Sequence, residues 1–100
     1  METRHVFQVV PDKFPLGHIV ATPGAVEKLE ELGRYPYELL GRHVTGDWGD
    51  LDFTEKKQNE LSLRQGLRLC SSYQLTSEEN LWIITEANRS GTTILLPDEL

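Results

Sequence analysis

Apolar residues recur at helical spacing in the first half of this chain and at strand spacing in the second half. Residues 18–21 are a short run with two β-branched residues at its centre, which predicts a strand. Thr22 and Pro23 then suit the N-cap and first position of a helix, because the N–H that proline lacks would have no partner there. Gly33 is expected to end this helix. Its apolar face consists of Val26, Leu29 and Leu32.

Two further helices are predicted in the middle of the chain. The second begins at Pro36 and ends at Gly46. The third covers about residues 53–65, with Asp52 as its N-cap and Gly66 as its stop. Its residues are mostly polar, so we expect it to lie on the surface.

After Gly66 the apolar period changes to two, and three strands are predicted. Residues 67–75 alternate along one strand, and residues 81–87 are apolar on both faces, which indicates a central strand. A tight turn at residues 88–91 leads to a last strand at residues 92–96. The order β-α-α-α-β-β-β predicts an α+β fold. We expect an antiparallel meander of three to four strands, with residues 18–21 as the fourth, and with the helices on one face.

Length and charge limit the organisation and the partners. A chain of 100 residues suffices for one core, so we assign residues 18–100 to a single domain. Residues 1–17 are treated as a leader of uncertain order, with residues 6–10 as a candidate edge strand. The formal net charge of −6 repels phosphates, which disfavours nucleic-acid binding.

The cysteine content points to a reducing compartment. Cys70 is the single cysteine, whereas small secreted domains usually carry several. The sequence shows neither a signal peptide nor an apolar run of about 20 residues that would cross a bilayer. We therefore predict a cytoplasmic protein without membrane association.

Residues 46–51 (Gly-Asp-Trp-Gly-Asp-Leu) are the densest local pattern in the chain. Glycines on both sides let the backbone bend around Trp48, so we expect the indole to be a buried anchor; an exposed indole would instead indicate a binding site. Asp47 and Asp50 are expected to hold the turn, with a partner-binding loop as the alternative. A cation site is a further alternative, because oxygen ligands suit hard cations. Its candidate ligands are His43, Asp47, Asp50 and Asp52.

The bend between the last two strands carries Glu86 and Arg89. These two side chains are spaced to form a surface ion pair. In our preferred hypothesis, Arg89 instead pairs with Asp47 or Asp50 and clamps the tryptophan loop onto the sheet.

Three blocks of the sequence resemble a family of small bacterial proteins of plasmids and integrative elements. The blocks are residues 14–26, 40–51 and 81–99, so the resemblance covers about residues 14–99. Some members of that family carry the label of a type I restriction enzyme modification subunit. A methyltransferase needs a glycine-rich cofactor turn and an Asn/Asp-Pro-Pro-aromatic motif, and this chain contains neither. Asn88 departs from the family pattern, in which an aspartate is expected.

No motif in the sequence identifies a reaction: it has no nucleophile elbow, phosphate loop or dinucleotide fingerprint. We predict a non-enzymatic, acidic protein-interaction protein of a mobile genetic element, which modulates a host DNA-defence system. We expect a protein partner and no cofactor, and the sequence is compatible with a homodimer. Two alternatives are a divalent-metal-binding regulator and a small toxin-like ribonuclease. The ribonuclease would use Arg64, Arg68, Tyr73 and His43.

Overall fold

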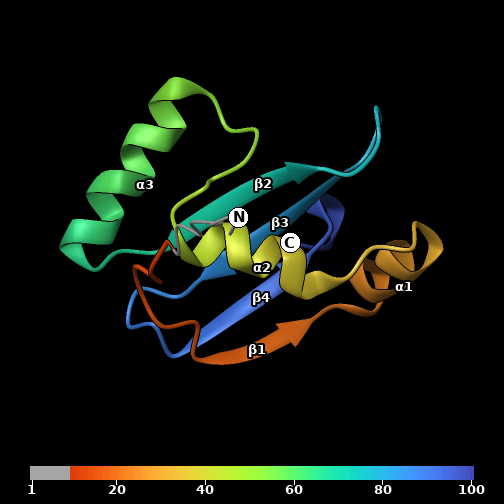
Figure 1. Cartoon of the computed structure of the whole chain (residues 1–100), viewed down its shortest axis with the longest axis horizontal. Coiled ribbons are helices and arrows are strands. Elements are labelled where there is room, and N and C mark those ends of the chain that lie inside the picture. The colour runs from red at the N-terminus through yellow and green to blue at the C-terminus, as the bar shows by residue number, and fades with distance from the viewer. Residues whose placement is uncertain (1–9) are drawn as a thin grey trace, which may run out of the picture.

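The computed structural model describes residues 10–100, which form a four-stranded sheet and three α-helices (Figure 1). The predicted α+β class and the order of the elements are confirmed. The candidate strand at residues 6–10 lies outside the described residues except for Val10, which is not in a strand. The elements are β1 (His18–Ala21), α1 (Pro23–Glu31), α2 (Pro36–Val44), α3 (Phe53–Gln65), β2 (Leu69–Gln74), β3 (Asn80–Thr85), β4 (Gly91–Leu95) and a 3₁₀ turn (Pro97–Glu99).

The sheet has the strand order β1-β4-β3-β2 and is mixed. Strands β2, β3 and β4 form the predicted antiparallel meander. Strand β1 is the fourth strand, but it pairs with β4 in parallel, so the expectation of a wholly antiparallel sheet is wrong. Tight turns fix the direction of β2, β3 and β4, whereas three helices separate β1 from the meander and leave its direction to tertiary packing.

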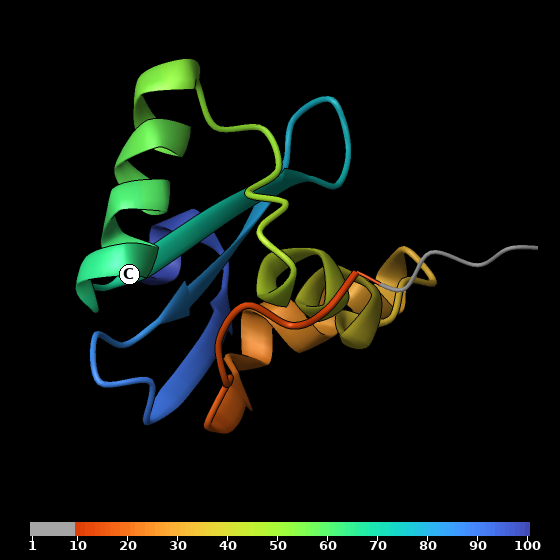
Figure 2. The ribbon, with the colours of Figure 1, turned by 60° about the vertical axis from the view of Figure 1, so that its left-hand side comes forward.

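Helices α1 and α2 cover one face of the sheet, and α3 runs beside β2 on the other side in Figure 2. The expectation that all helices share one face is therefore wrong. Alternate residues of the strands point toward α1 and α2 and are almost fully buried. The main core on this face consists of Ala25, Leu29, Leu39, Tyr73, Leu81, Ile83 and Ile94. Val26, which the helical pattern placed in the core, is exposed.

Local signals at the helix ends agree with the structure. The Thr22 hydroxyl accepts from the Ala25 amide at the start of α1. Asp52 and Glu55 form a capping box at the start of α3. Gly66 ends this helix with a left-handed φ of 69°.

Part of the segment before β1 belongs to the packed structure. Phe14 is buried in a second cluster with Val44, Trp48 and Leu69. The Lys13 amide donates to the Val44 carbonyl. Within residues 10–100, none of the helices is both long enough and apolar enough to pass through a bilayer.

Candidate functional site

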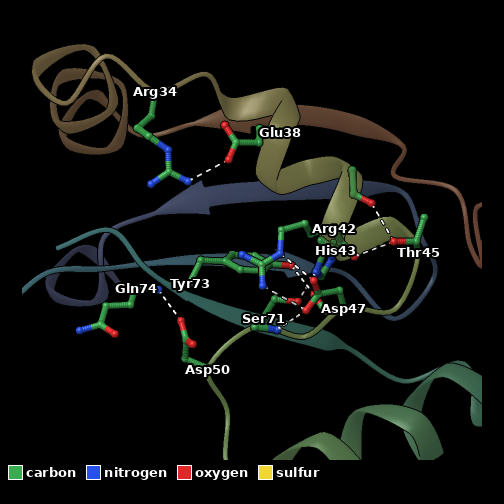
Figure 3. Close-up of polar contacts among 12 residues, drawn as sticks. Arg34, Glu38, Arg42, His43, Thr45, Asp47, Asp50, Ser71, Tyr73 and Gln74 are labelled. Atoms are coloured by element: carbon green, nitrogen blue, oxygen red, sulfur yellow. Dashed lines mark hydrogen bonds and ion pairs between the residues drawn. The ribbon is translucent and has the colours of Figure 1, made fainter. Parts of the chain in front are cut away.

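The loop at residues 46–51 closes the outer edge of β2. The Asp50 amide donates to the Ser72 carbonyl at 2.7 Å, and the Ser72 amide donates to the Trp48 carbonyl at 3.2 Å. The Asp50 carboxylate accepts a hydrogen bond from the backbone N–H of Gln74 at 2.6 Å (Figure 3). The backbone of Gly49 lies so close to Ser72 that a Cβ atom there would overlap the Ser72 carbonyl. The loop thus acts as a short additional strand beside β2.

Asn59 on α3 closes the remaining part of the same edge. Its side-chain amide donates to the Cys70 carbonyl at 2.6 Å, and its side-chain oxygen accepts from the Cys70 amide at 3.2 Å. The outward-pointing backbone groups of β2 are therefore bonded by this side chain and by the loop. A closed edge cannot pair with a further strand.

Trp48 is buried, as predicted, with 4% of its surface exposed. Its ring stacks with Phe14 at a centroid distance of 6.2 Å and meets His43 edge-on at 5.7 Å. The indole N–H donates to the Glu60 carboxylate on α3 at 2.7 Å. The indole therefore joins the loop to α3 and to the core, and it is not an exposed binding residue.

Asp47 is held by α2 rather than by the last hairpin. Its carboxylate accepts two hydrogen bonds from Arg42, at 2.7 and 3.2 Å (Figure 3). These bonds lower the pKa of Asp47 and raise that of Arg42. The Arg42 guanidinium also lies 4.7 Å from the centre of the Tyr73 ring. The Tyr73 hydroxyl donates to the Asp47 backbone carbonyl. Arg42 and Tyr73 together therefore fix the start of the loop at Asp47.

Arg89 binds the C-terminal end of α3, so the hypothesis that it pairs with Asp47 or Asp50 is wrong. Its guanidinium donates to the carbonyls of Leu67 at 2.6 Å and Ser62 at 3.3 Å. The carbonyls at a helix C-terminus lack intrahelical partners and carry partial negative charge, which attracts a cation.

The predicted ion pair between Glu86 and Arg89 is also wrong. The guanidinium bonds to the Glu86 backbone carbonyl at 3.1 Å and not to its carboxylate. Glu86 itself is exposed at the surface. Arg89 has a φ of 61°, which is unusual for a residue with a side chain. The hairpin bend is thus fixed to α3 by cation–carbonyl contacts.

His43 lies at the centre of a buried chain of hydroxyl groups. The ring contacts the Ser71 hydroxyl at 2.5 Å through Nδ1 and the Thr85 hydroxyl at 2.8 Å through Nε2. Thr85 contacts the Thr92 hydroxyl at 2.8 Å, and Thr92 donates to the Leu16 carbonyl at 2.7 Å. A carbonyl can only accept, so Thr92 must accept from Thr85, and Thr85 must accept from His43.

This chain of donors requires a proton on Nε2 of His43, and in the neutral ring Nδ1 then accepts from the Ser71 hydroxyl. Burial lowers the pKa of His43 to about 4, and the charge of Arg89 contributes in the same direction. The residue is fully buried. Neutral His43 therefore serves to satisfy buried hydroxyl groups of the core.

The four candidate metal ligands are not brought together. His43 and Asp47 have the partners given above, Asp50 binds the Gln74 amide, and Asp52 caps α3. Within residues 10–100, no three His, Cys, Asp or Glu side chains are grouped to hold a metal ion. The candidate cation site is therefore wrong.

Of the four residues offered for a ribonuclease, Arg64 and Arg68 are exposed, whereas Tyr73 and His43 are buried. Tyr73 is fully buried, and burial raises its pKa far above the ordinary value for tyrosine. His43 is buried as well, so neither side chain could reach an RNA phosphate.

Strand β1 forms the other edge of the sheet, and it is open. The His18 amide donates to the Ser90 carbonyl, just before β4, and the Thr22 amide donates to the Ile94 carbonyl in β4. Because backbone groups alternate along a strand, the amides and carbonyls of Ile19 and Ala21 point away from the sheet. Among residues 10–100 no strand pairs on this outer side. Ile19 and Val20 remain 45% and 44% exposed.

Two adjoining surface depressions extend from this edge along α1. A first depression lies at the end of β1, and a second shares Val26 and Glu30 with it. The exposed rings of Tyr35 and Tyr37 stack at 5.5 Å near its far end. The sequence did not identify this surface. Two features together indicate this surface: residues 18–21 carry no charged side chain, and their strand lies at the end of the sheet.

Comparisons with protein-family models, with curated proteins and with solved structures found no match. The resemblance to proteins of mobile elements accordingly stays a prediction.

Proposed function

We propose that this protein is a non-enzymatic protein-interaction module that receives its partner at the β1 edge. The observation that carries the proposal is the contrast between the two edges of the sheet. The β2 edge is closed by the loop at residues 46–51 and by Asn59, whereas β1 exposes the outer backbone groups of Ile19 and Ala21. A strand edge of this kind offers hydrogen bonds that a partner strand can complete.

The side chains of β1 also favour a partner. Proteins usually protect open edges with charged residues, prolines or bulges, and β1 contains none of these among residues 18–21. Ile19 shares the helix-covered face with Thr92, and Val20 shares the opposite face with Thr93. A partner strand would therefore find apolar contacts on both faces of the sheet.

The polar residues support a binding role over catalysis. Asp47 and Asp50 form bonds that hold the fold, and His43 is buried. The acidic charge of the chain adds electrostatic selectivity for its partner. Following the resemblance to proteins of mobile elements, we place the protein on such an element and its partner in a host DNA-defence system.

Capture from bacterial lysates with two edge variants and one control tests this proposal. Ile19→Pro removes an outward amide without removing a bond to β4, and Val20→Lys adds a charge to the edge. Phe53→Lys changes an exposed apolar residue on α3 and serves as the control. We expect a protein that is captured by the native chain and by the control but lost with both edge variants. Identical capture by all four proteins, or no specific capture, would refute the proposal.

A further inference from the structure

We infer that the occupant of the β1 edge is an extended peptide segment that joins the sheet as a fifth strand and carries a lysine or arginine for Glu27 and Glu30. This inference rests on the proposed function and specifies the chemistry of the partner. The open backbone groups of Ile19 and Ala21 require an extended segment, because only a strand presents matching donors and acceptors at the required spacing.

The surface beside the strand combines apolar and acidic residues. The first depression is lined by Ala21, Pro23, Val26, Glu27 and Glu30. A segment paired with β1 runs past this depression, because Ala21 is the last residue of the strand and Pro23 is the first of α1. Its side chains would therefore contact Val26 and approach the two carboxylates.

Glu27 and Glu30 are the carboxylates available for a partner cation. They are one helical turn apart and share the surface of α1 that faces the depression. Neither forms an ion pair within residues 10–100. The neighbouring cations are already used: Lys28 pairs with Glu31 and Glu79, and Arg34 pairs with Glu38. A basic side chain would compensate a local excess of negative charge.

Charge argues against a second copy as the occupant. Each copy carries a net charge of −6, so two copies repel each other. A second copy would also bring a further acidic surface to the edge, whereas a basic segment compensates the charge of Glu27 and Glu30.

A displayed library of random 12-residue peptides provides the probe. Selection on the full chain is expected to enrich peptides that combine alternating β-branched residues with a lysine or arginine. A synthetic enriched peptide should slow hydrogen exchange of the Ile19 and Ala21 amides, which point outward in the free protein. A copy of this peptide with N-methylated pairing amides should not bind.

Two double variants test the charge. Glu27→Gln with Glu30→Gln should weaken binding of the basic peptide about tenfold. Asp12→Asn with Glu78→Gln removes the same charge from residues that line neither depression, and it should leave binding unchanged. Thermal unfolding of each variant verifies that it is folded.

The possible failures are distinguishable. If acidic peptides protect Ile19 and Ala21 as well as basic ones do, the charge preference is refuted while the edge remains the docking site. If no peptide protects these amides, both this inference and the proposed function are refuted. If the Ile19 and Ala21 amides become protected as the protein concentration rises without peptide, and sedimentation shows a dimer, the occupant is a second copy and the peptide inference is refuted.

Discussion

Acidification below neutral pH should destabilise this protein, because His43 must be neutral in the fold. The pKa of His43 is lowered from 6.5 to about 4, mainly by burial and secondarily by the charge of Arg89. Between these two values the unfolded chain binds a proton that the folded chain excludes. The free energy of unfolding therefore falls as the pH decreases from about 6.5 toward 4.

The size of this effect follows from the pKa difference. One pKa unit corresponds to about 1.4 kcal/mol, so the full change between 6.5 and about 4 is about 3 kcal/mol. About 2 kcal/mol of this is lost between pH 7 and pH 5. A small domain has only about 5–15 kcal/mol of stability, so the loss is easily measured.

Urea unfolding at a series of pH values gives the slope, and the NMR shift of the His43 ring gives its pKa directly. The variant His43→Gln should be less stable at pH 7 and should lose most of the slope between pH 7 and pH 5. The control His18→Gln changes an exposed histidine and should keep the slope. A stability that stays constant between pH 7 and pH 5, or a slope that persists in His43→Gln, would refute the buried neutral state.

Three further predictions concern the contacts that hold the loop and the hairpin. Gly49→Ala should lower the free energy of unfolding by about 3 kcal/mol or more, because the methyl group would overlap the Ser72 carbonyl and φ is 78°. Gly33→Ala is the control: at φ 65° with open space around it, it should cost about 1 kcal/mol. Equal losses of stability in urea unfolding would contradict the overlap at Gly49. Arg89→Ala should lower stability by about 2 kcal/mol in urea unfolding, because it removes the bonds to the carbonyls of Leu67 and Ser62. Arg89→Gly should be about 1 kcal/mol more stable than Arg89→Ala, because glycine accepts the φ of 61°, and equal stability of the two variants would contradict this reasoning. Asn59→Ala should cost about 2 kcal/mol and speed hydrogen exchange of the Cys70 amide, whereas unchanged exchange would show that Asn59 does not close the edge.

The elements with local signals could be predicted from the sequence. The sequence predicts helix α3 at residues 53–65, as observed, because a capping residue and a glycine stop directly flank the segment. The burial of Trp48 was also predictable, since the glycines beside it indicate a tight bend around a large side chain. These signals depend on neighbours in the sequence and need no knowledge of tertiary packing.

The partners of charged residues could not be predicted in the same way. Arg89 binds backbone carbonyls at the end of α3, and every residue has a carbonyl, so no residue type signals this contact. The role of His43 is not signalled by its neighbours in the sequence, because the hydroxyl residues of the chain around it lie on three separate strands. The relevant signal was the hydroxyl residues Ser71, Thr85 and Thr92 at inward strand positions, where a polar group needs a buried partner.

The closed and open edges together explain why we propose the binding site away from the most distinctive residues of the sequence. Asp47 and Asp50 are the acids that a sequence pattern selects first, yet Arg42 and the Gln74 amide already occupy their carboxylates. Binding a partner there would require breaking bonds that hold the loop on β2. At the β1 edge no such bond has to break, because the outer groups of Ile19 and Ala21 are free among residues 10–100. A partner strand would gain hydrogen bonds and apolar contacts at this edge without loss of structure, and for this reason we propose residues 18–21 as the site of recognition.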